Sequence, residues 1–197
     1  MVTQGQQKQQ RAAERALGRP RHLRARYRAH SSRDVGPTKE RGNGKHAPTI
    51  HRILVPLDGS PVAESVVPFV ETLARRLNAS VVLFQAIAPG AVTSSVPEVS
   101  PYLADVVSFL QADAEIYLGR IADDLVRKGL EVSTMVTVES PESGIVNAAN
   151  DLKADLVALA THGRSGVARW VMGSTADAVV RRAGLPCLVV RAGDGVR

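Results

Sequence analysis

Residues that could bind a phosphate group are concentrated in the segment Thr161–Thr175, which reads THGRSGVARWVMGST. Gly173-Ser174-Thr175 is predicted to open a helix, and the first turn of a helix offers free N–H groups and a positive dipole end to an anion. The glycines would let the backbone approach a ligand, and the arginines would add charge: Gly163, Gly166, Gly173, Arg164 and Arg169. Alternatively, the glycines only shape the turn while Ser174 and Asp177 form a capping box for the helix.

A carboxylate that could meet the rest of such a ligand is Asp58, in the sequence Asp58-Gly59-Ser60-Pro61 after a predicted buried strand. It could accept a hydrogen bond from a ribose hydroxyl or hold Mg²⁺ through water. The alternative is an Asp-Gly pair that only forms a turn. His162 lacks Ser and Asp partners and a second histidine at metal spacing, so no catalytic role is predicted for it.

Several classes of protein are excluded by the sequence. The single cysteine, Cys187, leaves no disulfide scaffold and no site with several thiolate ligands. Cys187 is instead predicted to be a small core residue. No apolar run approaches the ~20 residues of a membrane helix, which predicts that the protein is not integral to a membrane. A P-loop and a Gly-x-Gly-x-x-Gly turn after the first predicted strand are both missing, which argues against nucleotide binding by either device.

Strands and helices are predicted to alternate along residues 49–193, which would form one domain, followed by a short tail at 194–197. The predicted strands are Ile50–Leu57, Val81–Ile87, Val132–Val138, Leu156–Ala160 and Cys187–Arg191, and the predicted helices are 61–77, 103–128, 141–152 and 174–183. This pattern predicts an α/β, doubly wound domain with a parallel sheet of order 3-2-1-4-5 or 2-1-3-4-5. Ligands bind beyond the carboxyl ends of such strands.

Positive charge is confined to residues 1–48. They hold twelve Lys and Arg against three Glu and Asp, a net of +9, whereas the whole chain carries +6, so the remainder carries −3. With few large apolar residues, this segment cannot offset its ordering entropy and is predicted to be disordered. It could be a solvated extension without a specific role, the product of an early start codon, or an electrostatic arm for nucleic acid or anionic lipid.

Four stretches of the chain resemble the universal stress protein family: ILVPLDGS at 53–60, ATHGRSG at 160–166, Gly173-Ser174, and LPCLVVR at 185–191. The resemblance covers about residues 49–193. It implies a five-stranded parallel sheet of order 3-2-1-4-5 with four helices. It also implies a homodimer formed through the last strands, whose apolar edge would otherwise be exposed.

One branch of that family binds ATP through the motif Gly-x-x-Gly-x₉-Gly-Ser/Thr. Gly163, nine further residues and Gly173-Ser174 match its last three elements, whereas the first element falls on Ala160. The methyl group of Ala160 could crowd the sugar or phosphates, or be absorbed by a small shift.

Carried over position by position, the resemblance implies a site for ATP and its Mg²⁺. Asp58 would contact the ribose and, through the nucleotide, the metal ion. Ala86 would meet adenine through its backbone, with Pro56 and Leu57 as walls. Ala160, His162 and Gly163 would line the sugar and first phosphates, and Gly173, Ser174 and Thr175 would hold the outer phosphates.

These features together predict a cytoplasmic, dimeric regulator of stress survival that binds ATP and has little or no catalytic activity. No side chain offers an evident general base for an attacking water. A regulatory protein partner of unknown identity is expected. Nucleic acid is not expected as a partner, except through the basic extension. Two alternatives stay open: a dimeric interaction module that binds no nucleotide, and an enzyme that cleaves a nucleotide at its α-phosphate.

Overall fold

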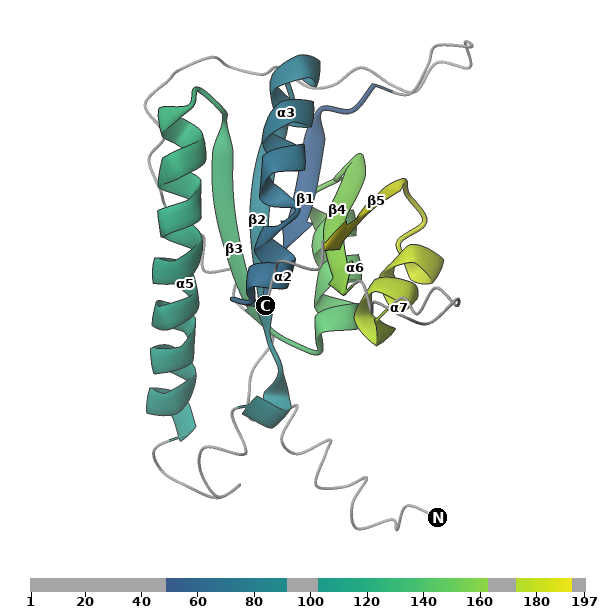
Figure 1. Cartoon of the computed structure of the whole chain (residues 1–197). Coiled ribbons are helices and arrows are strands. Elements are labelled where there is room, and N and C mark those ends of the chain that lie inside the picture. The colour runs from purple at the N-terminus through teal and green to yellow at the C-terminus, as the bar shows by residue number, and fades with distance from the viewer. Residues whose placement is uncertain (1–48, 92–102, 163–172, 193–197) are drawn as a thin grey trace.

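Five parallel strands form the centre of the domain (Figure 1). The computed structural model describes residues 49–91, 103–162 and 173–192, so the extension predicted to be disordered lies outside the described residues. The strands are β1 (Arg52–Pro56), β2 (Ser80–Ile87), β3 (Val132–Val138), β4 (Leu156–His162) and β5 (Cys187–Ala192). Their order is β3-β2-β1-β4-β5, which confirms the doubly wound α/β prediction and selects the order 3-2-1-4-5.

Helices cover both faces of this sheet. One face carries α2 (Pro61–Glu64), α3 (Val67–Leu77) and α5 (Leu103–Arg127), and the other carries α6 (Pro141–Asp151) and α7 (Ser174–Arg182) (Figure 1). Successive residues of β1 point to opposite faces: Ile53 and Val55 pack with the α3 and α5 residues, and Leu54 packs with those of α6 and α7. The central strand is therefore buried on both sides, as its unbroken apolar run predicts.

The first predicted helix is divided into α2 and α3, and residues 89–91 are helical as well, so the described residues hold more helices than the four expected. The helical apolar spacing runs through this region, but Pro68 interrupts it. Proline lacks the N–H that would bond to the carbonyl of Glu64, and its ring would clash with that carbonyl. The chain therefore ends α2 at Glu64 and begins α3 at Val67, with Pro68 in its first turn.

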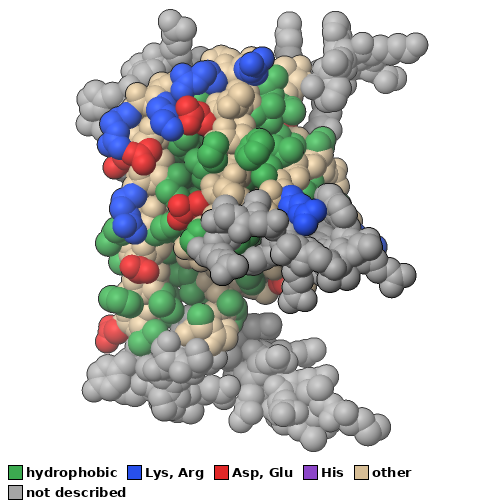
Figure 2. Space-filling view, in the orientation of Figure 1, with side chains coloured by type: hydrophobic (Ala, Val, Ile, Leu, Met, Phe, Trp, Pro, Cys, Tyr) green, Lys and Arg blue, Asp and Glu red, His purple; other side chains and the backbone are tan. Residues whose placement is uncertain are grey.

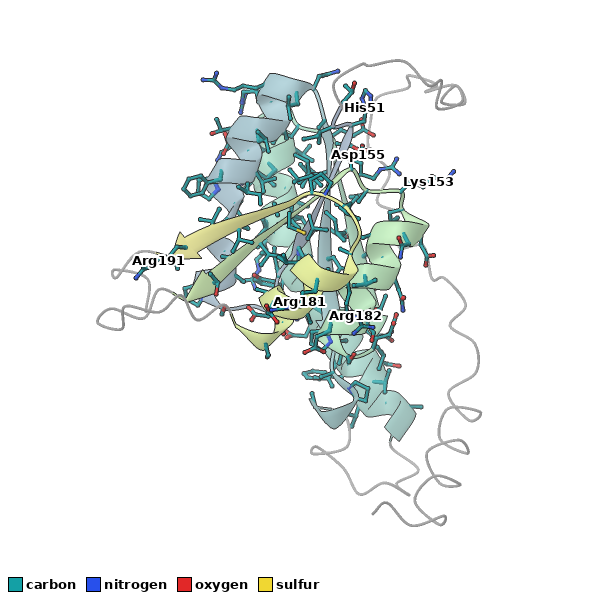
Figure 3. The ribbon with its side chains drawn as sticks, turned by 90° about the vertical axis from the view of Figure 1, so that its right-hand side faces the viewer. His51, Lys153, Asp155, Arg181, Arg182 and Arg191 are labelled. Atoms are coloured by element: carbon teal, nitrogen blue, oxygen red, sulfur yellow. The ribbon has the colours of Figure 1, made fainter. Side chains whose placement is uncertain are left out.

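Asp155 ties the start of β1 to the start of β4 at the amino edge of the sheet. Its Oδ2 accepts hydrogen bonds from the backbone N–H groups of His51 and Arg52, at 2.9 and 3.0 Å. Figure 3 shows His51 and Asp155 next to each other at this edge. The Arg52 guanidinium also donates to the carbonyl of Leu152. These bonds fix the register of the two strands whose opposite ends form the site.

Charged side chains gather over the ends of α3 and α5 that lie near the amino edge of the sheet (Figure 2). Glu71 of α3 accepts from Arg75 at 3.0 Å and from Lys128, just beyond α5, at 2.6 Å. The hydrogen bond from Lys128 is the main reason that the pKa of Glu71 is lowered. This surface network therefore joins the two helices at the edge remote from the site.

None of the described helices is long and apolar enough to cross a membrane.

Gly144 allows α6 to pack unusually close to β2. A Cβ at this position would lie 3.2 Å from Cζ of Phe84 and 3.3 Å from Cβ of Ala86. Phe84 is fully buried, and the added Cβ would also lie 3.3 Å from Oγ1 of Thr137, so more than one neighbour would have to move. We expect Gly144→Ala to lower the free energy of unfolding by about 1 kcal/mol, because overpacking outweighs the gain in helix propensity. Urea denaturation followed by circular dichroism measures the change.

Gly119 of α5 provides the matched control. A Cβ there would meet nothing within 4 Å, and its φ is in the ordinary helical region. Gly119→Ala is therefore expected to raise the free energy of unfolding by about 0.5–1 kcal/mol. If Gly144→Ala gains as much stability as the control, α6 and β2 do not pack as closely at Gly144 as the structure shows.

Candidate functional site

A cavity of about 180 Å³ opens at the carboxyl edge of the sheet, between the ends of β1 and β4. Its floor is apolar and is formed by Phe84, Ile145, Leu159 and Val179. Six of the ten residues predicted for the site line it: Pro56, Leu57, Asp58, Ala86, Ala160 and Thr175. The cavity therefore lies where a doubly wound sheet of this order places its ligands.

The turn after β1 holds Asp58 at the cavity. Asp58 Oδ1 accepts a hydrogen bond from the backbone N–H of Ser60 at 2.9 Å, and Gly59 takes a left-handed φ of 83° that favours glycine. Ser60 then caps α2, because its Oγ accepts from the N–H of Ala63 at 3.1 Å. Asp58 thus forms the turn that the Asp-Gly alternative predicted, and the same turn leaves its exposed carboxylate at the edge of the cavity.

Tyr117 of α5 lies close to this turn. Its hydroxyl is buried, and no described residue forms a hydrogen bond with it. Burial raises the pKa of Tyr117, and the negative charges of Glu64 and Asp58 raise it further. Tyr117 therefore stays neutral at physiological pH and adds no charge near Asp58.

The backbone conformation at the start of α7 does not require a glycine at position 173. Gly173 is the N-cap residue with φ −58° and ψ 152°, a conformation that any amino acid can adopt. A Cβ there would lie 4.0 Å from Oγ1 of Thr161, which is an ordinary contact. Within the described residues, neither φ nor a close contact requires a glycine at this position.

The first turn of α7 also lacks a cap from its own side chains. Ser174 is the first helical residue, and Asp177 pairs with Arg181 at 2.9 Å, so the predicted capping box is wrong. The cause is that Gly173 holds the N-cap position, where its N–H donates to Thr161 Oγ1 at 3.4 Å. The next N–H groups of the helix have no intrahelical acceptor and stay available to an anion.

The remaining predicted residues are placed less completely. Gly173 and Ser174 are exposed at the start of α7, next to the lining residue Thr175. His162 is the last residue of β4, and this strand ends two residues later than predicted. Gly163 lies outside the described residues, as do Arg164, Gly166 and Arg169.

Comparison with known proteins identifies the family. The sequence profile of the universal stress protein family matches residues 49–191. The chain belongs to the universal stress protein family. Universal stress protein MJ0531 of Methanocaldococcus jannaschii is 26% identical over 148 residues, which cover 71% of this chain and 81% of the relative.

Solved structures of other proteins share the fold of this universal stress protein. Protein MJ0577 has a TM-score of 0.65 and 24% identity, over 75% of this chain and 99% of its own. A universal stress protein solved in complex with cAMP has a TM-score of 0.53 and 22% identity, over 74% of this chain and 99% of its own. At these identities the likeness establishes the fold.

Glu142 does not line the cavity of this universal stress protein, but it contacts the lining residue Thr175 and was not among the predicted site residues. Its Oε1 accepts a hydrogen bond from Oγ1 of Thr175 at 3.5 Å, which joins the first turn of α6 to the first turn of α7. A signal was available, because Ser140-Pro141 marks a helix start after the third strand. All helix starts that follow parallel strands lie at the same edge of the sheet.

The donor set of the site is compatible with a nucleotide and its cation. The apolar floor could contact the faces of a base, and the carboxylate of Asp58 is an oxygen ligand of the kind that Mg²⁺ prefers. Among the residues described, no three His, Cys, Asp or Glu side chains come together as a metal site.

Proposed function

We propose that this universal stress protein binds an adenine nucleotide, ATP with Mg²⁺, in the cavity between β1 and β4. The observation that carries the proposal is the start of α7. Among the described residues, neither the backbone nor a close contact requires glycine at position 173, and no side chain caps the helix there, beside a cavity lined by Asp58. Such a helix terminus attracts anions through its dipole and its free donors.

The size and lining of the cavity indicate which part of the nucleotide would lie inside it and which parts would lie outside. At about 180 Å³ it is smaller than the roughly 300 Å³ at which most ligand pockets begin. We expect the base to enter the apolar part, with Pro56, Leu57 and Ala86 around it. The ribose would then meet Asp58, and the phosphates would lie over the start of α7. The complex of a similarly folded universal stress protein with cAMP supports an adenine nucleotide as ligand.

The proposed role is regulatory, with the bound nucleotide acting as a signal in a cytoplasmic dimer. No described lining residue other than Asp58 carries an ionisable side chain, and Asp58 is engaged in its turn. This supports binding with little or no catalysis. The edge strand β5 exposes part of Leu188, Val189 and Val190, which supports antiparallel pairing with a second copy. A protein partner would then bind the nucleotide-bound dimer.

A second candidate function is that of a dimeric interaction module that binds no nucleotide. The observation in its favour is Ala160, which lines the cavity at a position where the ATP-binding branch of the family has glycine. Mass spectrometry of small molecules released from the freshly purified protein separates the two functions. A nucleotide supports the first, and a protein that carries none and takes up none supports the second.

Gly173→Val tests the proposed contact with the phosphates. We expect isothermal titration of the full-length protein to show ATP affinity reduced at least tenfold, since the valine would cover the N–H groups of α7. The fold should be retained, because φ and the space around Gly173 accept a side chain.

The control for this variant is Gly119→Ala on α5, far from the cavity, which should bind ATP as the wild type does. Equal ATP affinity in the wild type and in Gly173→Val would show that α7 is not the phosphate site.

A further inference from the structure

The starts of α6 and α7 meet at the same side of the cavity. Pro141, the first residue of α6, and Thr175, in the first turn of α7, both line it. Two helix N-termini would together make a strongly anion-binding corner. This corner, however, already contains a negative group of the protein, the half-buried side chain of Glu142.

The contact between Glu142 and Thr175 changes what that corner offers to a ligand. A threonine hydroxyl has a single proton to donate. Thr175 Oγ1 lies 3.5 Å from Glu142 Oε1, at the outer limit of a hydrogen bond, and a hydroxyl turned toward Glu142 has no proton left for a phosphate oxygen. The corner then presents lone pairs and a carboxylate, which suit a cation, beside the N–H groups of α7, which suit a phosphate.

We propose that Glu142 is a specificity-determining residue that makes the site accept a nucleoside triphosphate as its complex with a divalent cation in preference to the metal-free anion. This inference rests on the proposed function, because it concerns the ligand of the same cavity. A metal-free triphosphate carries its charge out to the start of α7 and meets the carboxylate of Glu142 there. A bound divalent cation reduces that charge and can itself be held by the oxygens of the corner.

The same geometry separates long nucleotides from short ones. A monophosphate with its base in the cavity extends less far toward Thr175 and Glu142 than a triphosphate does. Glu142 therefore acts on the outer phosphates and leaves the binding of AMP nearly unaffected. The affinity for AMP consequently serves as an internal reference for the integrity of the base and ribose contacts.

The test measures the affinities of AMP, ATP with EDTA, and ATP with Mg²⁺ for the full-length protein by isothermal titration. In the wild type, ATP should bind at least tenfold more weakly without the metal than with it, as expected for like charges in a partly buried corner. In Glu142→Gln the gap should shrink to about threefold or less, because metal-free ATP binds more tightly, while AMP affinity stays within about twofold. Glutamine keeps the acceptor oxygen for Thr175, so the local structure is preserved.

Two further variants isolate the charge of Glu142. Glu139 lies just before α6, and its Oε2 accepts from Asn147 at 2.8 Å, away from the cavity lining. Glu139→Gln removes a neighbouring charge and should keep the wild-type gap. Glu142→Asp retains the charge and should retain most of the difference in ATP affinity with and without Mg²⁺. This variant shows that the effect comes from the charge and not from replacing the residue.

The outcomes distinguish this inference from the proposed function. An unchanged gap in Glu142→Gln, or an equal change for AMP, overturns the role of Glu142 while leaving nucleotide binding intact. A wild-type protein that binds none of the three ligands overturns both the role of Glu142 and the proposed function.

Discussion

Phe84→Ala is expected to lower the free energy of unfolding by about 3–5 kcal/mol, the usual cost of deleting a large side chain from a packed core. Phe84 on β2 is 0% exposed and packs in the cluster between the sheet and α6 and α7. Its ring packs next to Gly144 of α6, where glycine offers no side chain to fill the space that the ring would leave. Urea denaturation of the variant and the wild type gives the difference directly.

Phe69→Ala is the matched control for this substitution. Phe69 of α3 is the same residue type but is 55% exposed. Its loss should change the free energy of unfolding by no more than about 0.5 kcal/mol, as for most surface positions. If Phe84→Ala costs less than about 1 kcal/mol, the buried position of this ring in the structure is wrong.

Ala160→Leu is expected to abolish nucleotide binding, with a loss of affinity of at least about 100-fold, or about 2.7 kcal/mol. Ala160 is half-buried near the end of β4 and lines the cavity. Ala160 also packs against the core cluster of Ile53 and Val55, so the larger side chain must take up space in the cavity or press on that core. Titration with ATP and Mg²⁺ measures the loss, and thermal unfolding shows whether the fold is kept.

Ala112→Leu controls for the added apolar surface. Ala112 lies on α5 and is exposed, so a leucine there should leave both nucleotide affinity and thermal stability close to those of the wild type. Undiminished ATP affinity in Ala160→Leu would place the nucleotide elsewhere. It would then overturn the proposal that the cavity between β1 and β4 is the nucleotide site.

The sheet could be predicted from the sequence because its signals are local. Ile53, Leu54 and Val55 are consecutive apolar residues, and only a strand covered on both faces buries all three. The break at Pro68 shows the limit of the helical spacing, which continues across a residue that cannot donate its hydrogen bond.

The site was predictable only in part, because its parts come from distant segments. Asp58 and the start of α7 follow strands with clear sequence signals, and the fold brings them to one cavity. Glu142 was missed because its meaning depends on where α6 crosses the sheet, which puts it against Thr175, 33 residues further along the chain. The capping box failed because β4 and Gly173 determine where α7 begins, and spacing within the helix does not.

The short helix α2 has a consequence for how members of this family can diverge. It buries no residue, and Pro68 separates it from α3, yet its Ala63 lines the cavity. A substitution at Ala63 would therefore reshape one wall of the pocket, although Ala63 also packs against the core on the α3 face. A change in α2 can therefore alter the ligand preference of the cavity while the sheet stays the same.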